Sequence, residues 1–334
     1  MFKYKRREYY NIKFPLTNGR KAVVVSEPGP SSVLKYSDVP TPKVKVGWSL
    51  VKVKGFGINH SEIFTREGKS PSVEFPRILG IEVVGEVFES TTSNLSIGQK
   101  VMSFMGEMGR AYDGSYAEYV LLPNDQIYPI QSKLSWDKLA AIPETFYTAY
   151  GSLVGLRIKD NDELLIRAGT SGVGVAAAKL AKAMGKIIVS STTRDLSKTG
   201  LLKRIGVDKV IFDKNGTLQT ESKFDKILDL MGPRTVSDSL TMLKKFGIVS
   251  STGQLGEIWT LNDFDPIMKI PNNCYLTSFY SGQIDKQLLQ DLLDLIEIKR
   301  IDVAPTKIYK LSEVQRAHDF LESKNSFGKA VVIV

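Results

Sequence analysis

The feature that most constrains the fold is a glycine-rich turn in mid-chain, between an apolar run and an alanine-rich segment. Residues 163–168 predict a short strand, residues 169–174 read GTSGVG, and residues 172–184 predict a helix that begins inside the turn. Residues 186–192 predict a second strand. Glycines let the backbone approach a bound group, and a helix start offers free N–H groups and a positive dipole end. The arrangement indicates a site for the pyrophosphate of a dinucleotide.

The hydrophobic pattern changes along the chain and indicates two kinds of sheet. Over residues 21–130, alternating apolar residues and frequent turn residues predict an antiparallel or barrel-like domain. Its expected strands are residues 22–25, 50–53, 81–88, 100–103 and 116–122. From residue 160 onward strands alternate with helices, which predicts a parallel, doubly wound α/β sheet. Further strands are expected at 209–212, 226–230, 247–251 and 330–334, and helices at 195–205, 235–244, 286–298 and 312–323.

Composition narrows the class of protein. The 334 residues suffice for two domains, and a hydrophobic content of 42% is ordinary for a globular protein. There is no apolar run of the roughly 18 residues that would span a bilayer, and residues 1–20 lack the apolar stretch of a signal peptide. The only cysteine, Cys274, excludes an internal disulfide and fits a reducing compartment. We therefore expect a cytoplasmic protein with no membrane partner.

The net charge of +9 is concentrated at the start of the chain. Residues 1–21 carry seven lysines and arginines against one acid, Glu8, and so account for +6 of the total. We interpret residues 1–20 as a basic N-terminal extension, which is a flexible tail, an upstream translation start or a tether to an anionic surface. The remaining charge is close to balance, so no nucleic-acid partner is expected.

The end of the second strand beside the turn indicates which dinucleotide is bound. Sites for NAD usually place an acid there for the ribose 2′-hydroxyl. Residues 190–194 instead read SSTTR, and Lys198 follows. Hydroxyls and two cations suit a 2′-phosphate, although Arg194 and Lys198 could also lie on a solvated helix face. Asp195 is adjacent and must point elsewhere if Arg194 faces the phosphate. NADPH is therefore favoured over NADH.

Several further segments carry a resemblance to a known family. They are residues 57–59 (GIN), 79–82 (LGIE) with Gly85, 114–119 (GSYAEY), 140–143 (AAIP) with Thr148 and Ala149, the glycine-rich turn, and 321–332 at the C-terminus. In their order and spacing, the chain resembles the medium-chain dehydrogenase/reductase superfamily, in its zinc-independent quinone oxidoreductase group. The resemblance covers nearly all of residues 21–334.

The resemblance implies how the chain is divided. A GroES-like, β-rich catalytic domain would comprise residues 21–143 and 281–334, and a Rossmann NADP-binding domain would comprise residues 144–280. The mid-chain position of the turn follows from this interruption. The resemblance also implies a cleft between the domains that holds the nicotinamide and a small electrophilic acceptor, and a homodimer formed through the Rossmann sheets.

The resemblance also implies the residues of the site. Asn59 would contact the nicotinamide end or simply form a turn, and Thr148 would lie near the nicotinamide carboxamide or ribose. The implied cofactor residues are Thr170, Ser171, Gly172, Val173 and Gly174 at the pyrophosphate; Thr193, Arg194 and Lys198 at the 2′-phosphate; Thr252, Gly253, Phe279 and Tyr280 beside the nicotinamide; and Asn325 on the C-terminal wall. Relatives carry a cleft tyrosine where this chain has Phe64, and a tyrosine against the adenosine phosphate where it has Asp213. An acid at that second position would repel a 2′-phosphate unless it turned away.

A zinc site is not expected. Zinc relatives carry a cysteine near the position of Asn59 and a histidine where this chain has Ile81. A structural zinc needs about four Cys or His ligands, and this chain has only His60, His318 and Cys274. We expect a surface, packing or substrate-contacting role for His60 and structural roles for His318 and Cys274.

Without a Lewis acid to lower the pKa of a hydroxyl, alcohol oxidation is difficult. Hydride transfer from NADPH to a quinone or an α,β-unsaturated carbonyl is easier, because such acceptors are already electron-poor. The sequence therefore predicts an NADPH-dependent reductase of such acceptors. Enoyl or 2-alkenal reduction is a close rival to quinone reduction. A non-catalytic NADPH- or RNA-binding protein of the same fold is the alternative from another class.

Overall fold

The computed structural model describes residues 19–334, and almost all of the expected basic extension, residues 1–18, lies outside them. Arg20 is the first residue of strand β1 (Arg20–Val25), and its guanidinium donates a hydrogen bond to the carbonyl oxygen of Tyr119. Strand β1 therefore begins at the last residue of the range that we had assigned to the extension.

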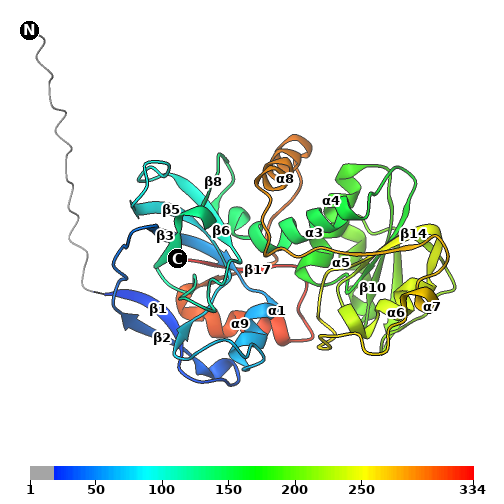
Figure 1. Cartoon of the computed structure of the whole chain (residues 1–334), viewed down its shortest axis with the longest axis horizontal. Helices are drawn as coiled ribbons and strands as arrows, with labels where there is room; N and C mark the ends of the chain where they lie inside the picture. Colours follow the sequence, from blue (N-terminus) through cyan, green and yellow to red (C-terminus); the bar gives the residue numbers. More distant parts are fainter. Residues whose placement is uncertain (1–18) are drawn as a thin grey trace, which may run out of the picture.

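The β-rich half of the molecule lies on the left of Figure 1, and its strands pair antiparallel except for β16 and β17, which are parallel. A small sheet has the order β2 (Leu34–Val39), β1, β4 (Arg77–Ile78). A larger sheet has the order β16 (Lys307–Lys310), β17 (Ala330–Ile333), β3 (Trp48–Gly57), β5 (Glu82–Ser90), β6 (Lys100–Phe104), β8 (Tyr128–Pro129), and β7 (Tyr119–Pro123) pairs with β3. Alternating apolar residues such as Val51 and Val53 turn into one shared core, which is why the period-2 pattern predicted these strands.

The end of the chain returns to this first half. Strand β17 pairs antiparallel with β3, with Val331 opposite Gly57 and Val332 opposite Phe56. Helix α9 (Val314–Glu322), which precedes β17 in the chain, packs against the same half (Figure 1). The β-rich half is therefore made from both ends of the chain, as a GroES-like domain interrupted by a second domain requires.

The second half is a mainly parallel seven-stranded sheet, on the right of Figure 1. Its order is β12 (Thr217–Leu218), β11 (Lys209–Lys214), β10 (Ile188–Thr193), β9 (Glu163–Arg167), β13 (Phe224–Asp229), β14 (Leu243–Ser251), β15 (Tyr275–Ser278). Every pair from β11 to β15 is parallel. Leu164, Leu165 and Ile166 on central β9 are fully buried because elements cover both faces. The predicted Rossmann-like sheet is confirmed.

Helices surround this sheet and join it to the β-rich half. They are α3 (Pro143–Gly155), α4 (Gly172–Met184), α5 (Thr199–Arg204), α6 (Val236–Thr241), α7 (Pro266–Lys269) and α8 (Lys286–Lys299). Helices α3 and α4 share a core with residues of β5 and β6, so one apolar cluster runs between the two halves. Short helices α1 (His60–Arg66) and α2 (Trp136–Ala140) belong to the β-rich half.

Several predicted boundaries are wrong. The helix expected at 235–244 ends at Thr241, because β14 already begins at Leu243, which pairs with Phe224. The helix expected at 195–205 is a 3₁₀ turn, Leu196–Lys198, followed by α5. The one expected at 312–323 likewise begins as a 3₁₀ turn, Leu311–Glu313, before α9. Within residues 19–334, no helix is long and apolar enough to cross a membrane.

Candidate active site

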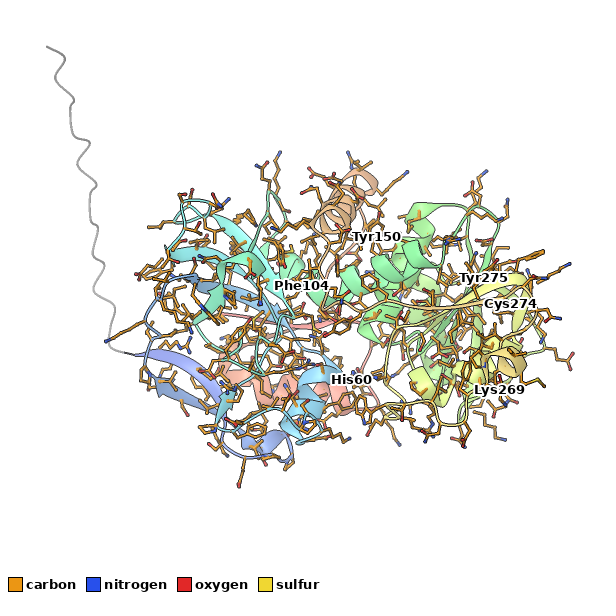
Figure 2. The ribbon with its side chains drawn as sticks, viewed as in Figure 1. His60, Phe104, Tyr150, Lys269, Cys274 and Tyr275 are labelled. Atoms are coloured by element: carbon orange, nitrogen blue, oxygen red, sulfur yellow. The ribbon has the colours of Figure 1, made fainter. Side chains whose placement is uncertain are left out.

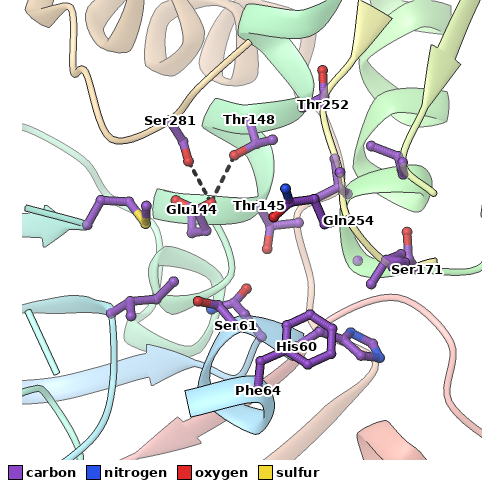
Figure 3. Close-up of a pocket in the computed structure, with 18 of the residues that line it drawn as sticks. His60, Ser61, Phe64, Glu144, Thr145, Thr148, Ser171, Thr252, Gln254 and Ser281 are labelled. Carbon is purple, nitrogen blue, oxygen red and sulfur yellow. Dashed lines mark hydrogen bonds between the residues drawn. The ribbon is translucent and has the colours of Figure 1, made fainter. Parts of the chain in front are cut away.

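A cavity of about 670 Å³ opens where the two halves meet (Figure 3). Its walls come from α1, the start of α3, the start of α4, the segments after β14 and β15, and the residues just before β17. Apolar and polar side chains share the lining, which is typical of a small-molecule site.

The glycine-rich turn forms one end of this cavity. Ser171 is the N-cap of α4, and its Oγ accepts a hydrogen bond from the Gly174 N–H at 3.1 Å. Among the described residues, the N–H groups of Gly172 and Val173 have no acceptor, and both residues line the cavity. These free donors at the positive end of a 13-residue helix suit a pyrophosphate.

The glycines of this turn serve different purposes. A Cβ on Gly169 would lie 1.6 Å from Ser191 Oγ, and one on Gly174 would lie 2.6 Å from the Ala168 carbonyl oxygen. Both glycines therefore allow the turn to pack against the sheet. A Cβ on Gly172 would have no neighbour closer than 3.5 Å, because this residue faces the open cavity. The open space beside Gly172 leaves room for a bound dinucleotide, and this observation does not depend on the sequence motif.

The residues expected at a 2′-phosphate gather at the end of β10, outside the cavity lining. Thr193 is buried, and its hydroxyl donates to the Asp195 carbonyl oxygen at 2.9 Å. Lys198 Nζ donates to the Ser326 carbonyl oxygen at 2.8 Å. Arg194 is exposed, and no side chain or carbonyl of the described residues pairs with its guanidinium. Arg194 is therefore the cation best able to meet an incoming phosphate.

Both acids near this position accept hydrogen bonds from backbone N–H groups. The Asp195 carboxylate accepts from the Ser197 N–H at 3.0 Å and so caps the following turn. Asp213 is buried, accepts from the Gly216 N–H at 2.6 Å, and lies 3.9 Å from Nη2 of the fully buried Arg167. The acid that replaces the relatives' tyrosine is thus turned inward.

All four residues predicted to be catalytic line the cavity. They are Asn59, Phe64, Thr148 and Tyr280. Of the predicted cofactor residues, Ser171, Gly172, Val173, Thr252, Gly253 and Phe279 line it, whereas Thr170, Gly174, Thr193, Arg194, Lys198 and Asn325 do not. Asn325 is exposed in the turn after α9.

The rim carries contacts across the cleft. Phe64 on α1 meets Trp259, from the loop after β14, edge to face with ring centroids 5.3 Å apart. Lys69 Nζ lies 2.6 Å from Glu257 Oε2 and 5.3 Å from the Phe64 ring centroid. These contacts join the β-rich half to a loop of the parallel-sheet half, so the cavity is partly covered.

A buried ion pair, which sequence reasoning missed, lies at the floor of the site, where Lys329 lines the cavity and Glu82 does not. Lys329 Nζ donates to Glu82 Oε1 and to Asn59 Oδ1, each at 2.6 Å. Asn59 Nδ2 donates to the same Glu82 oxygen at 2.8 Å. The side chains of Lys329 and Glu82 are 6% and 0% exposed. The Lys329 ammonium group therefore contacts Asn59, the residue near whose position we expect zinc relatives to carry a cysteine.

Two further buried carboxyl groups lie beside this pair. Glu62 Oε1 accepts from the Ile81 N–H at 3.2 Å, and Glu62 Oε2 accepts from the Asn59 N–H at 3.1 Å. Glu144, the second residue of α3, lines the cavity. Burial raises the pKa of Glu62 and of Glu144 to about 7, and the charge of Glu82 adds to the rise. Both groups therefore titrate near neutral pH.

A signal for this cluster was present in the sequence. Glu82, Glu144 and Lys329 all lie within or next to segments that we used for the resemblance, and each interrupts an apolar run. Charged residues in buried segments must pair or shift their pKa values, because the charged form loses its hydration. We read those segments for their glycines and apolar residues instead.

The two histidines differ. His60 lies between the two halves (Figure 2) and lines the cavity, and burial lowers its pKa. His318 is fully buried: its Nδ1 accepts from Arg66 Nη1 at 3.2 Å, and its Nε2 lies 3.0 Å from the Tyr116 hydroxyl. Burial lowers the pKa of His318 to about 3, so it is neutral. Its expected structural role fits these contacts, because they link α1 to α9.

Cys274 lies far from His60 in the parallel-sheet half (Figure 2). Its Sγ donates to the Lys244 carbonyl oxygen at 3.3 Å. Within the described part of the chain, no three His, Cys, Asp or Glu side chains are grouped so that they could hold a metal ion.

Comparison with known proteins agrees with the geometry. Residues 45–132 match the family described as alcohol dehydrogenase GroES-like domain, and residues 205–332 match the family described as zinc-binding dehydrogenase. Quinone oxidoreductases from Pongo abelii and Homo sapiens are each 28% identical over 330 residues, which cover 94% of this chain and 98% of theirs. The solved quinone oxidoreductase of Coxiella burnetii is 29% identical with a TM-score of 0.81, over 95% of this chain and 99% of that one.

A mycobacterial structure in complex with NADPH shares the fold, with a TM-score of 0.80 and 24% identity over 94% of this chain and 100% of that one. Taken with the site, these similarities define an oxidoreductase with a cleft suited to a nicotinamide cofactor. The chain belongs to the medium-chain dehydrogenase/reductase superfamily, in its quinone oxidoreductase-like group.

Proposed function

We propose that this protein is a zinc-independent, NADPH-dependent reductase that transfers a hydride to a quinone or an α,β-unsaturated carbonyl. The observation that carries the proposal is the cavity itself. It joins the free N–H groups at the start of α4 to a floor formed by Asn59 and Lys329, both of which are hydrogen-bonded to the fully buried Glu82. The quinone oxidoreductases to which the chain is similar support the choice of acceptor.

The preference for NADPH rests on the end of β10. Arg194 is exposed and unpaired among the described residues, the Asp195 carboxylate caps the following turn, and Asp213 is buried against Arg167. A guanidinium binds a phosphate through charge-assisted hydrogen bonds. The similar mycobacterial structure that contains NADPH agrees with this assignment.

Zinc independence rests on the contacts of Asn59. Its oxygen already accepts from the Lys329 ammonium, which also neutralises Glu82. A zinc ion at this position would be repelled by the ammonium and would find an isoleucine, Ile81, where zinc relatives supply a histidine. Although one matching family is described as zinc-binding, the donor set of this chain does not fit that metal.

When bound, NADPH supplies the hydride, and the chain's own residues supply position and polarity. Gly172 and Val173 hold the pyrophosphate, while Thr148, Thr252 and Phe279 orient the nicotinamide end against the floor. The Lys329 ammonium stabilises negative charge that develops on the acceptor oxygen. Phe64 and Trp259 limit the entry of water at the rim.

We assign residues 21–143 and 281–334 to the catalytic domain and residues 144–280 to the cofactor domain. We also propose a cytoplasmic homodimer that acts on small molecules and binds neither nucleic acid nor membrane.

An acceptor panel tests the function. Purified protein is mixed with NADPH or NADH and a naphthoquinone, a benzoquinone, a 2-alkenal or an enoyl thioester, and the absorbance of the reduced cofactor is followed. Acceptor-dependent oxidation of NADPH that exceeds that of NADH supports the proposal. If neither cofactor is oxidised with any acceptor, the result favours the alternative of a non-catalytic NADPH- or RNA-binding protein. Binding of RNA whose affinity falls steeply with salt concentration would support that alternative further.

A further inference from the structure

The carboxyl group of Glu144 is placed as a proton source inside the cavity. It lies at the start of α3, where the chain passes from the β-rich half to the parallel-sheet half. Its Oε1 accepts hydrogen bonds from Ser281 Oγ at 2.8 Å and from Thr148 Oγ1 at 3.2 Å (Figure 3). Its Oε2 is buried and has no hydrogen-bond partner among the described residues. A buried carboxylate with one unpaired oxygen is costly, so the neutral form is favoured.

The groups around Glu144 shift its pKa in opposite directions, and the net shift is upward. Burial makes the largest contribution to its raised pKa of about 7, and the carboxylate of Glu82 on β5 adds to it. The Lys329 ammonium, next to β17, lowers the pKa but is already paired with Glu82. The cavity is also lined by the ionisable side chains of His60, Lys69, Arg110 and Tyr280. Outside the lining, Tyr147 on α3 interacts with Glu144, and Glu62 on α1 interacts with Glu82.

The hydroxyl groups of Ser281 and Thr148 both belong to residues that border the cavity. Ser281 and Thr148 both line the cavity, and both donate to the same Glu144 oxygen. The proposed function assigns Thr148 to the nicotinamide end, which leaves Ser281 as the hydroxyl between the carboxyl group and the acceptor. The chain thus places an acid behind a hydroxyl group at the cavity wall.

We propose that Glu144 supplies, through the hydroxyl group of Ser281, the proton that completes reduction of the acceptor. The inference deepens the proposed function and rests on it. Ser281 is the catalytic residue that touches the acceptor, and Glu144 acts through it. The acceptor of this class is one whose reduction leaves an oxyanion, such as a quinone or an enone.

The step balances without any further reactant. A bound reduced nicotinamide would supply a hydride to the electrophilic atom of the acceptor, whose π-electron pair would move to the acceptor oxygen. With the acceptor bound, the Ser281 hydroxyl turns its proton from Glu144 Oε1 to the acceptor oxygen, and its Oγ then accepts a hydrogen bond from the carboxyl proton of neutral Glu144 across the same 2.8 Å contact. The acceptor oxygen takes the Ser281 proton as the Glu144 proton passes to Ser281 Oγ. The cofactor is oxidised, the acceptor is reduced, and the Glu144 carboxylate regains a proton from water.

The first test is the dependence of kcat on pH. Because neutral Glu144 is the active form, kcat of the wild-type protein should be level below about pH 7 and fall about tenfold per unit above it. Glu144→Gln keeps an oxygen for both hydroxyl donors but has no acidic proton. Its kcat should be about 100-fold lower at pH 6 and independent of pH, with an unchanged KM for NADPH.

Two variants separate a proton relay from a structural role. Ser281→Ala should lower kcat to a similar extent while leaving the carboxyl group in place. Glu62→Gln removes the other carboxyl group that titrates near pH 7, and it does not line the cavity. Its profile should keep the fall above neutral pH. If the fall persists in Glu144→Gln, or disappears in Glu62→Gln instead, Glu144 is not the proton source.

A spectroscopic measurement that does not require turnover tests the protonation of Glu144 separately from the proposed reductase activity. Infrared difference spectra of the cofactor-free protein, recorded as pH rises through 7, should show loss of a protonated-carboxyl band in the wild type and in Ser281→Ala. The Glu144 component of that band should be missing in Glu144→Gln. If the wild type oxidises NADPH but the Glu144 component never appears, the relay fails and the reductase stands. If no acceptor is reduced at all, the proposed function fails first.

Discussion

The buried pair of Glu82 and Lys329 provides a quantitative test of how the floor of the site is held. Replacing Lys329 by Met removes the ammonium but keeps most of the side-chain volume. Glu82 then remains fully buried, with hydrogen bonds only from Asn59 Nδ2 at 2.8 Å and the Glu144 N–H at 2.9 Å. A buried carboxylate left without its counter-ion destabilises a protein by about 3–5 kcal/mol.

The free energy of unfolding is measured by urea denaturation at neutral pH, followed by tryptophan fluorescence with both midpoint and slope fitted. We expect Lys329→Met to lose about 3–5 kcal/mol. The double variant Glu82→Gln with Lys329→Met should recover most of that loss, since no charge is left unpaired. A large difference in the free energy of unfolding between the single and double variants would show that the unpaired Glu82 carboxylate causes the loss.

Lys69→Met is the matched control. Lys69 also pairs with acids, Glu67 and Glu257, but its side chain is 38% exposed. Loss of an exposed pair should cost less than about 1 kcal/mol. The reasoning is refuted if Lys329→Met and Lys69→Met destabilise the protein equally, or if the double variant is no more stable than Lys329→Met alone.

Three shorter predictions follow from the same geometry. Arg194→Ala should raise the KM for NADPH about tenfold or more and leave that for NADH nearly unchanged; equal changes in steady-state kinetics would reject the 2′-phosphate assignment. Because the pKa of Glu62 is raised to about 7 in the folded state, wild-type stability should fall as pH rises from about 4.5 to 7 and then level off. Glu62→Gln should reduce this slope by about 1.4 kcal/mol per pH unit in urea titrations and leave the part that is due to Glu144, whose pKa is also raised to about 7. An unchanged slope would show that Glu62 does not contribute to it. Elemental analysis of the purified protein should find less than stoichiometric zinc, and a chelator should leave turnover intact; one zinc per chain would contradict the role given to Lys329.

The sequence predicted the parts of the fold that depend on periodic patterns. Strand β9, the turn and α4 were placed within a residue of their observed bounds, since buried strands and an alanine-rich helix have strong local signals. Helix α1 was missed because it spans only seven residues, and most of them are polar, so it shows no helical repeat of apolar residues. Helix α6 was drawn too long, because an apolar run continues from it into β14.

The site was predicted less completely than the fold. Residues such as Asn59 and Gly172 were found because they sit in recognisable segments. Glu144 and Ser281 are separated by more than a hundred residues and meet only because the segment after β15 packs against α3. No local pattern reports such a contact. The inward turn of Asp213 was equally hidden, since it depends on Arg167 of another strand.

Calorimetric titration of the full chain with NADPH and with NADH tests the central claim most directly. If the start of α4 holds a pyrophosphate and Arg194 holds a 2′-phosphate, NADPH should bind at one site per chain and more tightly than NADH. Binding of neither cofactor would contradict the account.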